Sequence, residues 1–114
     1  MYGWTGTILR VDLSSGKVTR EALDPQVARE YIGARGLGGY IIRSEVDPKV
    51  DALSPANKLV FAAGPLTGTF APSAGRYNVC TKSPLNESLA ASNSGGAFGP
   101  ELKYAGYDAL IVEG

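Results

Sequence analysis

The turn Asn93-Ser94-Gly95-Gly96 is the segment best suited to hold a ligand, because it follows a short strand pattern and precedes a helix pattern. The first N–H groups of a helix have no partner within the helix, and the helix dipole adds partial positive charge there. Two adjacent glycines let a ligand approach this backbone closely. The segment suits an anion such as phosphate. The alternative, which the residues by themselves favour, is a plain strand-to-helix turn. No Gly-Lys-Ser/Thr follows it, which excludes a Walker loop.

Arg76 is the second candidate. It stands where a loop of small residues, GPLTGTFAPSAG (64–75), gives way to a strand pattern. A guanidinium in this position can pair bidentately with phosphate or carboxylate, and the alternative is a surface arginine with a local salt bridge. Arg35, between Gly33 and Gly36, is a similar candidate. Cys80 shares a strand face with Arg76 and is predicted to be a small packed residue, since no His, Lys or second Cys accompanies it on that face.

The composition limits what else the chain can do. Its 114 residues include no His and one Cys, and 11 Lys+Arg balance 11 Asp+Glu. These counts exclude an internal disulfide, a Cys/His zinc site, a thiolate-held iron–sulfur cluster and a triad with a histidine base within this chain. The zero net charge argues against nucleic acid and anionic membranes as partners. We expect a cytoplasmic protein, since residues 1–20 do not resemble a secretory signal.

The elements that must position these residues follow from the hydrophobic pattern. Strands are predicted over residues 5–13, 17–22, 59–63, 76–82, 88–92 and 109–112, and helices over 25–32, 37–45 and 97–105. The fold class is therefore α+β, a mostly β domain with a few short helices. The run 59–63 is expected to be buried on both faces.

Asp24 and Pro25 are the predicted N-cap and first residue of the first helix, and Gly33 its C-terminal cap. The glycine cluster 33–40 does not match G-x-G-x-x-G, because Ile41 stands in place of the third glycine. We expect these glycines to allow a sharp bend between two helices and close backbone packing.

Three blocks of sequence carry a family resemblance: MYGWTGTILRVDLSSGKV, LSPANKLVFAAGPLTGTFAPSAGRYNVCTKSPL and ASNSGGAFGPELKYAGYDALIVEG. In this order they resemble the N-terminal part of the tungsten-containing aldehyde ferredoxin oxidoreductases. The resemblance implies an enzyme that oxidises aldehydes to carboxylic acids. Its electrons would pass from tungsten, or molybdenum, held by two pterins, through a 4Fe-4S cluster to ferredoxin or a partner subunit. It also implies that residues 1–114 form the β base on which the pterins rest.

The resemblance also implies roles for particular residues. Arg76, Asn93 and Gly95 match positions that contact the pterin phosphates or the magnesium that bridges them, with Ser94 and Gly96 completing the cofactor-binding turn and Asn93 the magnesium candidate. Cys80 matches no cluster ligand. The cluster cysteines, a second pterin-binding segment and the acid/base residues of the family lie beyond this stretch, so we expect the 114 residues to be a fragment that is inactive alone and that could self-associate. The alternative from another class is a non-catalytic module of the same fold that binds a phosphate-bearing ligand or a partner chain.

Overall fold

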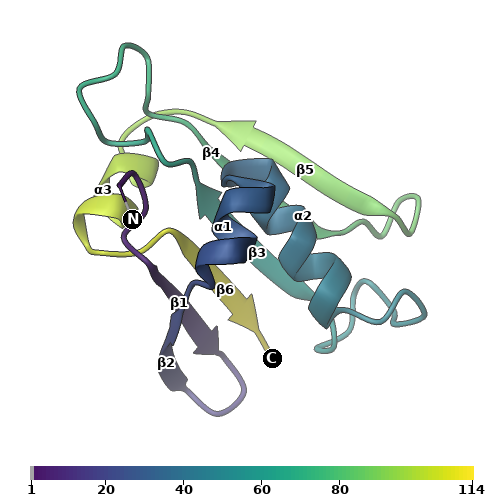
Figure 1. The fold of residues 1–114 in the computed structure, drawn as a ribbon. Helices are drawn as coiled ribbons and strands as arrows, with labels where there is room; N and C mark the ends of the chain where they lie inside the picture. Colours follow the sequence, from purple (N-terminus) through teal and green to yellow (C-terminus); the bar gives the residue numbers. More distant parts are fainter. Residues whose placement is uncertain (1) are drawn as a thin grey trace.

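The computed structural model describes residues 2–114, which form one mixed sheet and three helices. The sheet has six strands in the order β2-β1-β6-β3-β4-β5, and only β1 and β6 run parallel. The elements in chain order are β1 (Thr7–Asp12), β2 (Lys17–Ala22), α1 (Pro25–Tyr31), α2 (Ala34–Glu45), β3 (Lys58–Ala63), β4 (Tyr77–Lys82), β5 (Leu89–Ser94), α3 (Phe98–Tyr104) and β6 (Ala109–Glu113). The predicted α+β class is confirmed (Figure 1).

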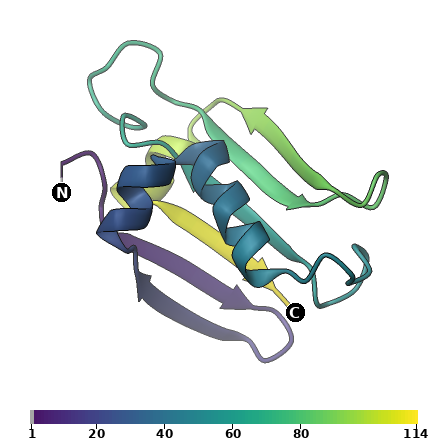
Figure 2. The ribbon, with the colours of Figure 1, turned by 45° about the vertical axis from the view of Figure 1, so that its right-hand side comes forward.

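Helices α1 and α2 cover one face of the sheet (Figure 2). The hydrophobic core lies beneath them, and its largest wholly buried apolar side chains are Leu37, Val60 and Ile111. The opposite face is only partly covered, by α3, whose Phe98 ring lies 4.9 Å from that of Tyr77. The expectation that residues 59–63 are buried on both faces is therefore wrong, since Leu59 is 36% exposed on the uncovered side.

The start of α1 is confirmed. The Asp24 carboxylate accepts the Gln26 N–H at 2.9 Å, and Pro25 begins the helix. The end of α1 differs from expectation, because Ile32 is the C-cap, with φ of 66°. Gly33 instead precedes α2, where a Cβ would lie 2.8 Å from the Ala63 carbonyl oxygen. Gly33 is the N-cap of α2 with an extended φ of 169°, so its close approach to β3, and not a left-handed C-cap of α1, requires glycine there.

Helix α2 begins three residues earlier than predicted and contains Gly36, Gly38 and Gly39. The sharp bend lies before it, at residues 32–34. A Cβ on Gly38 would lie 2.6 Å from the Cys80 sulfur, so this glycine allows α2 to press on β4. Cys80 itself is fully buried, which confirms it as a packed residue, and burial raises the pKa of its thiol.

No helix within residues 2–114 is long and apolar enough to cross a membrane.

Candidate functional site

The candidate residues meet at one end of β4 and β5. Arg76 immediately precedes β4, and Asn93 and Ser94 are the last two residues of β5. The prediction that the turn begins at Asn93 is wrong, because Asn93 pairs with Asn78 and Ser94 with Tyr77 in the ladder. These pairings outweigh the low strand preference of Asn and Ser. The turn proper comprises Gly95, Gly96 and Ala97, with Gly96 at φ of 89°.

Arg76 and Asn93 contact each other directly. The Arg76 Nη1 donates to the Asn93 Oδ1 at 2.8 Å, and both residues are exposed. None of the carboxylates in residues 2–114 forms an ion pair with Arg76. A local salt bridge is thus not what occupies this guanidinium. Its remaining N–H groups can donate hydrogen bonds to an anionic ligand.

Gly95 lies beside the guanidinium of Arg76. A Cβ at this position would lie 3.9 Å from both Cζ and Nε of Arg76. Ser94 alternates with Asn93 along β5, so it belongs to the other face of the sheet, together with Tyr77. The structure therefore brings Arg76, Asn93 and Gly95 together, while the Ser94 side chain lies away from them.

The small-residue loop fixes the backbone of Arg76. The buried Thr67 hydroxyl donates to the Arg76 carbonyl oxygen at 3.0 Å and accepts the Gly64 N–H at 3.0 Å. Gly99 of α3 packs against the same loop, since a Cβ there would lie 3.1 Å from both the Gly75 carbonyl oxygen and the Thr67 methyl group. The loop and α3 thus fix the backbone of Arg76 in the absence of a ligand. Less conformational entropy is then lost when a ligand binds.

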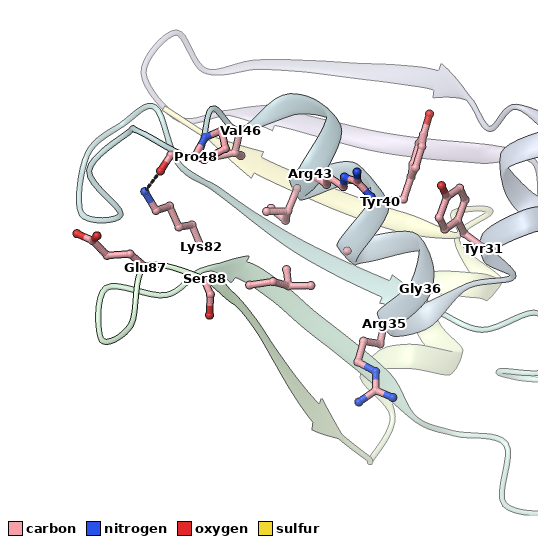
Figure 3. A pocket seen from close by; sticks show the side chains of 13 residues that line it. Tyr31, Arg35, Gly36, Tyr40, Arg43, Val46, Pro48, Lys82, Glu87 and Ser88 are labelled. Atoms are coloured by element: carbon pink, nitrogen blue, oxygen red, sulfur yellow. Dashed lines mark hydrogen bonds between the residues drawn. The ribbon is translucent and has the colours of Figure 1, made fainter.

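The start of α3 contributes less than the sequence suggested. The helix has seven residues, no side chain caps its first turn, and Glu101 already supplies a negative charge there. The positive charge of this region therefore comes mainly from two guanidinium groups, those of Arg76 and Arg35. Arg35 belongs to the neighbouring α2, and its side chain reaches toward β4 and β5 (Figure 3). Its charge acts to lower the pKa of the Cys80 thiol, against the larger effect of burial.

Two further features were not anticipated from the sequence. Asn78, on the same strand face as Arg76, is 9% exposed, and its side chain makes no hydrogen bond to the described residues. A cavity of about 520 Å³ lies between α2 and the start of β5, lined by residues that include Tyr31, Tyr40 and Leu89. Across residues 2–114, no three His, Cys, Asp or Glu side chains are grouped as a metal site.

Comparisons with known proteins identify the family of the chain. The family model described as "Aldehyde ferredoxin oxidoreductase, N-terminal domain" matches residues 8–114. The chain belongs to the aldehyde ferredoxin oxidoreductase family. The tungsten-containing aldehyde ferredoxin oxidoreductases of Pyrococcus furiosus and Pyrococcus horikoshii are 57% and 56% identical to it over its whole length. The chain spans 19% of the length of each of these relatives.

One solved structure of another enzyme contains the same fold. A chain of the active-site complex BamBC of benzoyl coenzyme A reductase, in complex with 1,5-dienoyl-CoA, superposes with a TM-score of 0.96. The two sequences are 45% identical. The match covers 99% of the chain described here and 17% of the chain from the BamBC complex. The same domain therefore occurs in proteins named for different substrates.

Proposed function

We propose that this chain is the cofactor-holding N-terminal domain of a tungsten-dependent aldehyde oxidoreductase. The observation that carries the proposal is the guanidinium of Arg76, which bonds the neutral Asn93 amide beside the Gly95 backbone and has no carboxylate partner among the described residues. Two relatives are identical to this chain at more than half of its positions, and both are named as tungsten-containing enzymes. These names support tungsten as the metal.

The residues fit a pterin phosphate. Arg76 offers several N–H donors in a fixed plane, and charge-assisted bonds of this kind are among the strongest hydrogen bonds in proteins. Gly95 has no Cβ to block the approach of phosphate oxygens to the backbone. Asn93 holds the guanidinium in place and offers an oxygen of the type that magnesium binds, so it is the proposed magnesium contact.

A bound tungsten–pterin cofactor would supply the redox chemistry that converts an aldehyde and water into a carboxylic acid, two protons and two electrons. This chain's share is binding and orientation. Arg76 and Asn93 anchor the phosphate end, and the fixed loop 64–75 limits how far that anchor can move. No residue among those described is assigned a proton-transfer step.

The remaining components of the proposal lie outside these residues. A 4Fe-4S cluster needs four thiolates, and the sequence offers only Cys80, whose thiol is buried against α2. Cluster, acid/base groups, substrate pocket and the surface for ferredoxin or an electron-transfer subunit would come from the rest of the enzyme. Aldehyde is favoured over a coenzyme A thioester because identity to the aldehyde enzymes is higher, 57% against 45%. Molybdenum in place of tungsten, and the cytoplasmic location, remain predictions.

The test compares Arg76→Ala with Arg43→Ala in the complete enzyme, purified from a host supplied with tungstate and molybdate. Arg43 is an exposed arginine of α2 that forms no ion pair in the described chain, so it controls for loss of charge. We expect tungsten and pterin per chain to fall at least about fivefold in Arg76→Ala only, because a charged hydrogen bond contributes about 1.5–3 kcal/mol. Full occupancy in Arg76→Ala would contradict the proposed role. Wild-type enzyme without tungsten, molybdenum or pterin would favour the non-catalytic module instead.

A further inference from the structure

The first turn of α2 lies at the same end of the sheet as Arg76. Gly33, which precedes α2, is within reach of the Ala63 carbonyl at the end of β3. Ala63 is paired with Tyr77, the residue after Arg76, and Tyr77 is paired with Ser94. The beginning of α2, the beginning of β4 and the end of β5 therefore converge (Figures 1 and 2).

This end of α2 carries positive charge without a negative partner. The helix has 12 residues and no acidic residue in its first turn, where Arg35 stands instead. An arginine is unfavourable beside the positive end of a helix dipole. None of the ion pairs in the described chain includes Arg35. A bound anion would turn this unfavourable arrangement into a favourable one.

Asn78 supplies an independent observation beneath the same turn. It lies two residues before Cys80 on the strand face that α2 covers, and Cys80 contacts Gly38. Two strand residues span about 6.6 Å, or about four residues of helix rise, which places Asn78 beneath residue 34. Asn78 also stands directly opposite Asn93 in the ladder, on the same face.

The side chain of Asn78 is largely buried and bonds to no described residue. The residue is 9% exposed, and no other part of the described chain donates to or accepts from its amide. No wholly inaccessible side-chain nitrogen or oxygen in residues 2–114 lacks a partner, so this amide is still reached from outside. An amide that is largely withdrawn from water favours a hydrogen-bond partner, and the remaining access leaves room for a ligand or water to supply one.

We propose that Arg35, Asn78 and the first-turn N–H groups of α2 complete the binding site for the cofactor phosphate. Together with Arg76 and Asn93, these residues form what we call the open cluster: Arg35, Arg76, Asn78 and Asn93. This inference rests on the proposed function, since Arg76 and Asn93 are its starting point. Arg35 then approaches the phosphate from the α2 side, and the Asn78 amide donates to it from below.

The test uses Arg35→Gln and Asn78→Leu in the complete enzyme, with Arg43→Gln at the other end of α2 as the matched control. Tungsten per chain and released pterin are the first readouts, and thermal unfolding of tungsten-free enzyme is the second. We expect Arg35→Gln and Asn78→Leu each to lower tungsten per chain at least about threefold, since losing one such bond weakens binding by about tenfold. Arg43→Gln should retain full tungsten. Tungsten-free Asn78→Leu should unfold no earlier than wild type, because the amide has no partner to lose.

The outcomes separate the two proposals. If Arg76→Ala loses tungsten while Arg35→Gln and Asn78→Leu keep it, the inference is overturned and the proposed function stands. If all three keep it, both fall. If tungsten-free Asn78→Leu unfolds well below wild type, Asn78 serves the fold, and its assignment to the site is overturned.

Discussion

The two ends of α2 contrast in how their charges are satisfied. At its last residue, Glu45, the helix joins four charged side chains of β1, β2, β3 and β6. We call these five residues the paired cluster: Arg10, Glu21, Glu45, Lys58 and Glu113. At its first turn it joins the open cluster, where no carboxylate of the described chain neutralises either arginine. Both clusters lie on the sheet face that α1 and α2 cover.

The paired cluster is satisfied by the chain itself. The Arg10 Nε and Nη2 bond the two Glu21 carboxylate oxygens at 2.6 and 3.0 Å, and Arg10 Nη1 lies 2.8 Å from Glu45. These bonds, with those to Glu21 first, raise the pKa of Arg10. Lys58 bonds Glu113. Charges that are satisfied within the chain stabilise the fold, and charges that the fold leaves open are available to a ligand. The contrast predicts large stability effects in the first group and none in the second.

The largest expected effect concerns a buried carboxylate that is satisfied in the same way. Asp108 is 1% exposed and accepts the N–H groups of Thr5 and Gly6 at 2.9 and 2.8 Å and the Lys103 ammonium at 2.7 Å. Asp108→Ala should lower the free energy of unfolding by about 3–5 kcal/mol, because the Lys103 ammonium keeps only the Gly3 carbonyl oxygen and loses the carboxylate that balances its charge. Denaturant unfolding measures this loss. Glu101→Ala, an exposed control, should change it by less than about 0.5 kcal/mol, and an equally small change for Asp108→Ala would contradict the prediction.

Arg10→Met should have the next largest effect. It removes the cation shared by Glu21, Glu45 and Glu113, whose carboxylates then repel one another, at a cost of about 2–3 kcal/mol. Arg43→Met, at an unpaired arginine, is the matched control and should be neutral. Equal stabilities of the two variants would show that the paired cluster does not support the fold.

Acid should weaken the paired cluster at Glu113. The hydrogen bond from Lys58, followed by the charges of Lys58 and Arg10, holds the pKa of Glu113 below its ordinary value of 4.5. The stabilisation is therefore present above pH 4.5 and is lost as pH falls through the lower folded-state pKa. Unfolding measured from pH 6 to pH 3 should show a shallower loss of stability in Glu113→Gln than in wild type. Identical slopes would mean that Glu113 does not contribute.

The smallest effect is expected in the open cluster. Arg35→Gln and Arg76→Ala should change the free energy of unfolding of tungsten-free enzyme by less than about 0.5 kcal/mol, because neither guanidinium has an ion pair to lose. The measurement is the same denaturant titration. A loss above about 2 kcal/mol in either variant would remove the distinction between the clusters.

Much of this arrangement could be predicted from the sequence where the signal is local. The hairpin of β1 and β2 follows from alternation interrupted by Ser14-Ser15-Gly16, and the Asp24-Pro25 start of α1 follows from capping chemistry. Loop, strand and turn signals indicate Arg76 and the segment 93–96, and the family resemblance adds the specific choice of Asn93 and Gly95. Their cofactor role remains a proposal.

The rest depends on contacts that local patterns do not contain. Ile32 adopts φ of 66°, which a β-branched residue rarely does, while the adjacent Gly33 is needed for its closeness to β3. A sequence reading naturally assigns the positive φ to the glycine. Alternation along residues 76–82 predicts the strand face of Asn78, but its burial depends on α2, a segment distant in the sequence.

The most direct measurement is the distance from the Arg76 guanidinium nitrogens to the nearest cofactor phosphate oxygen in a crystal structure of the tungsten-loaded enzyme. We predict a bond of about 2.7–3.2 Å, with the same phosphate also reached from Arg35 and Asn78. A phosphate bound elsewhere, with Arg76 still bonded only to Asn93, would contradict the assignment of the open cluster to the cofactor.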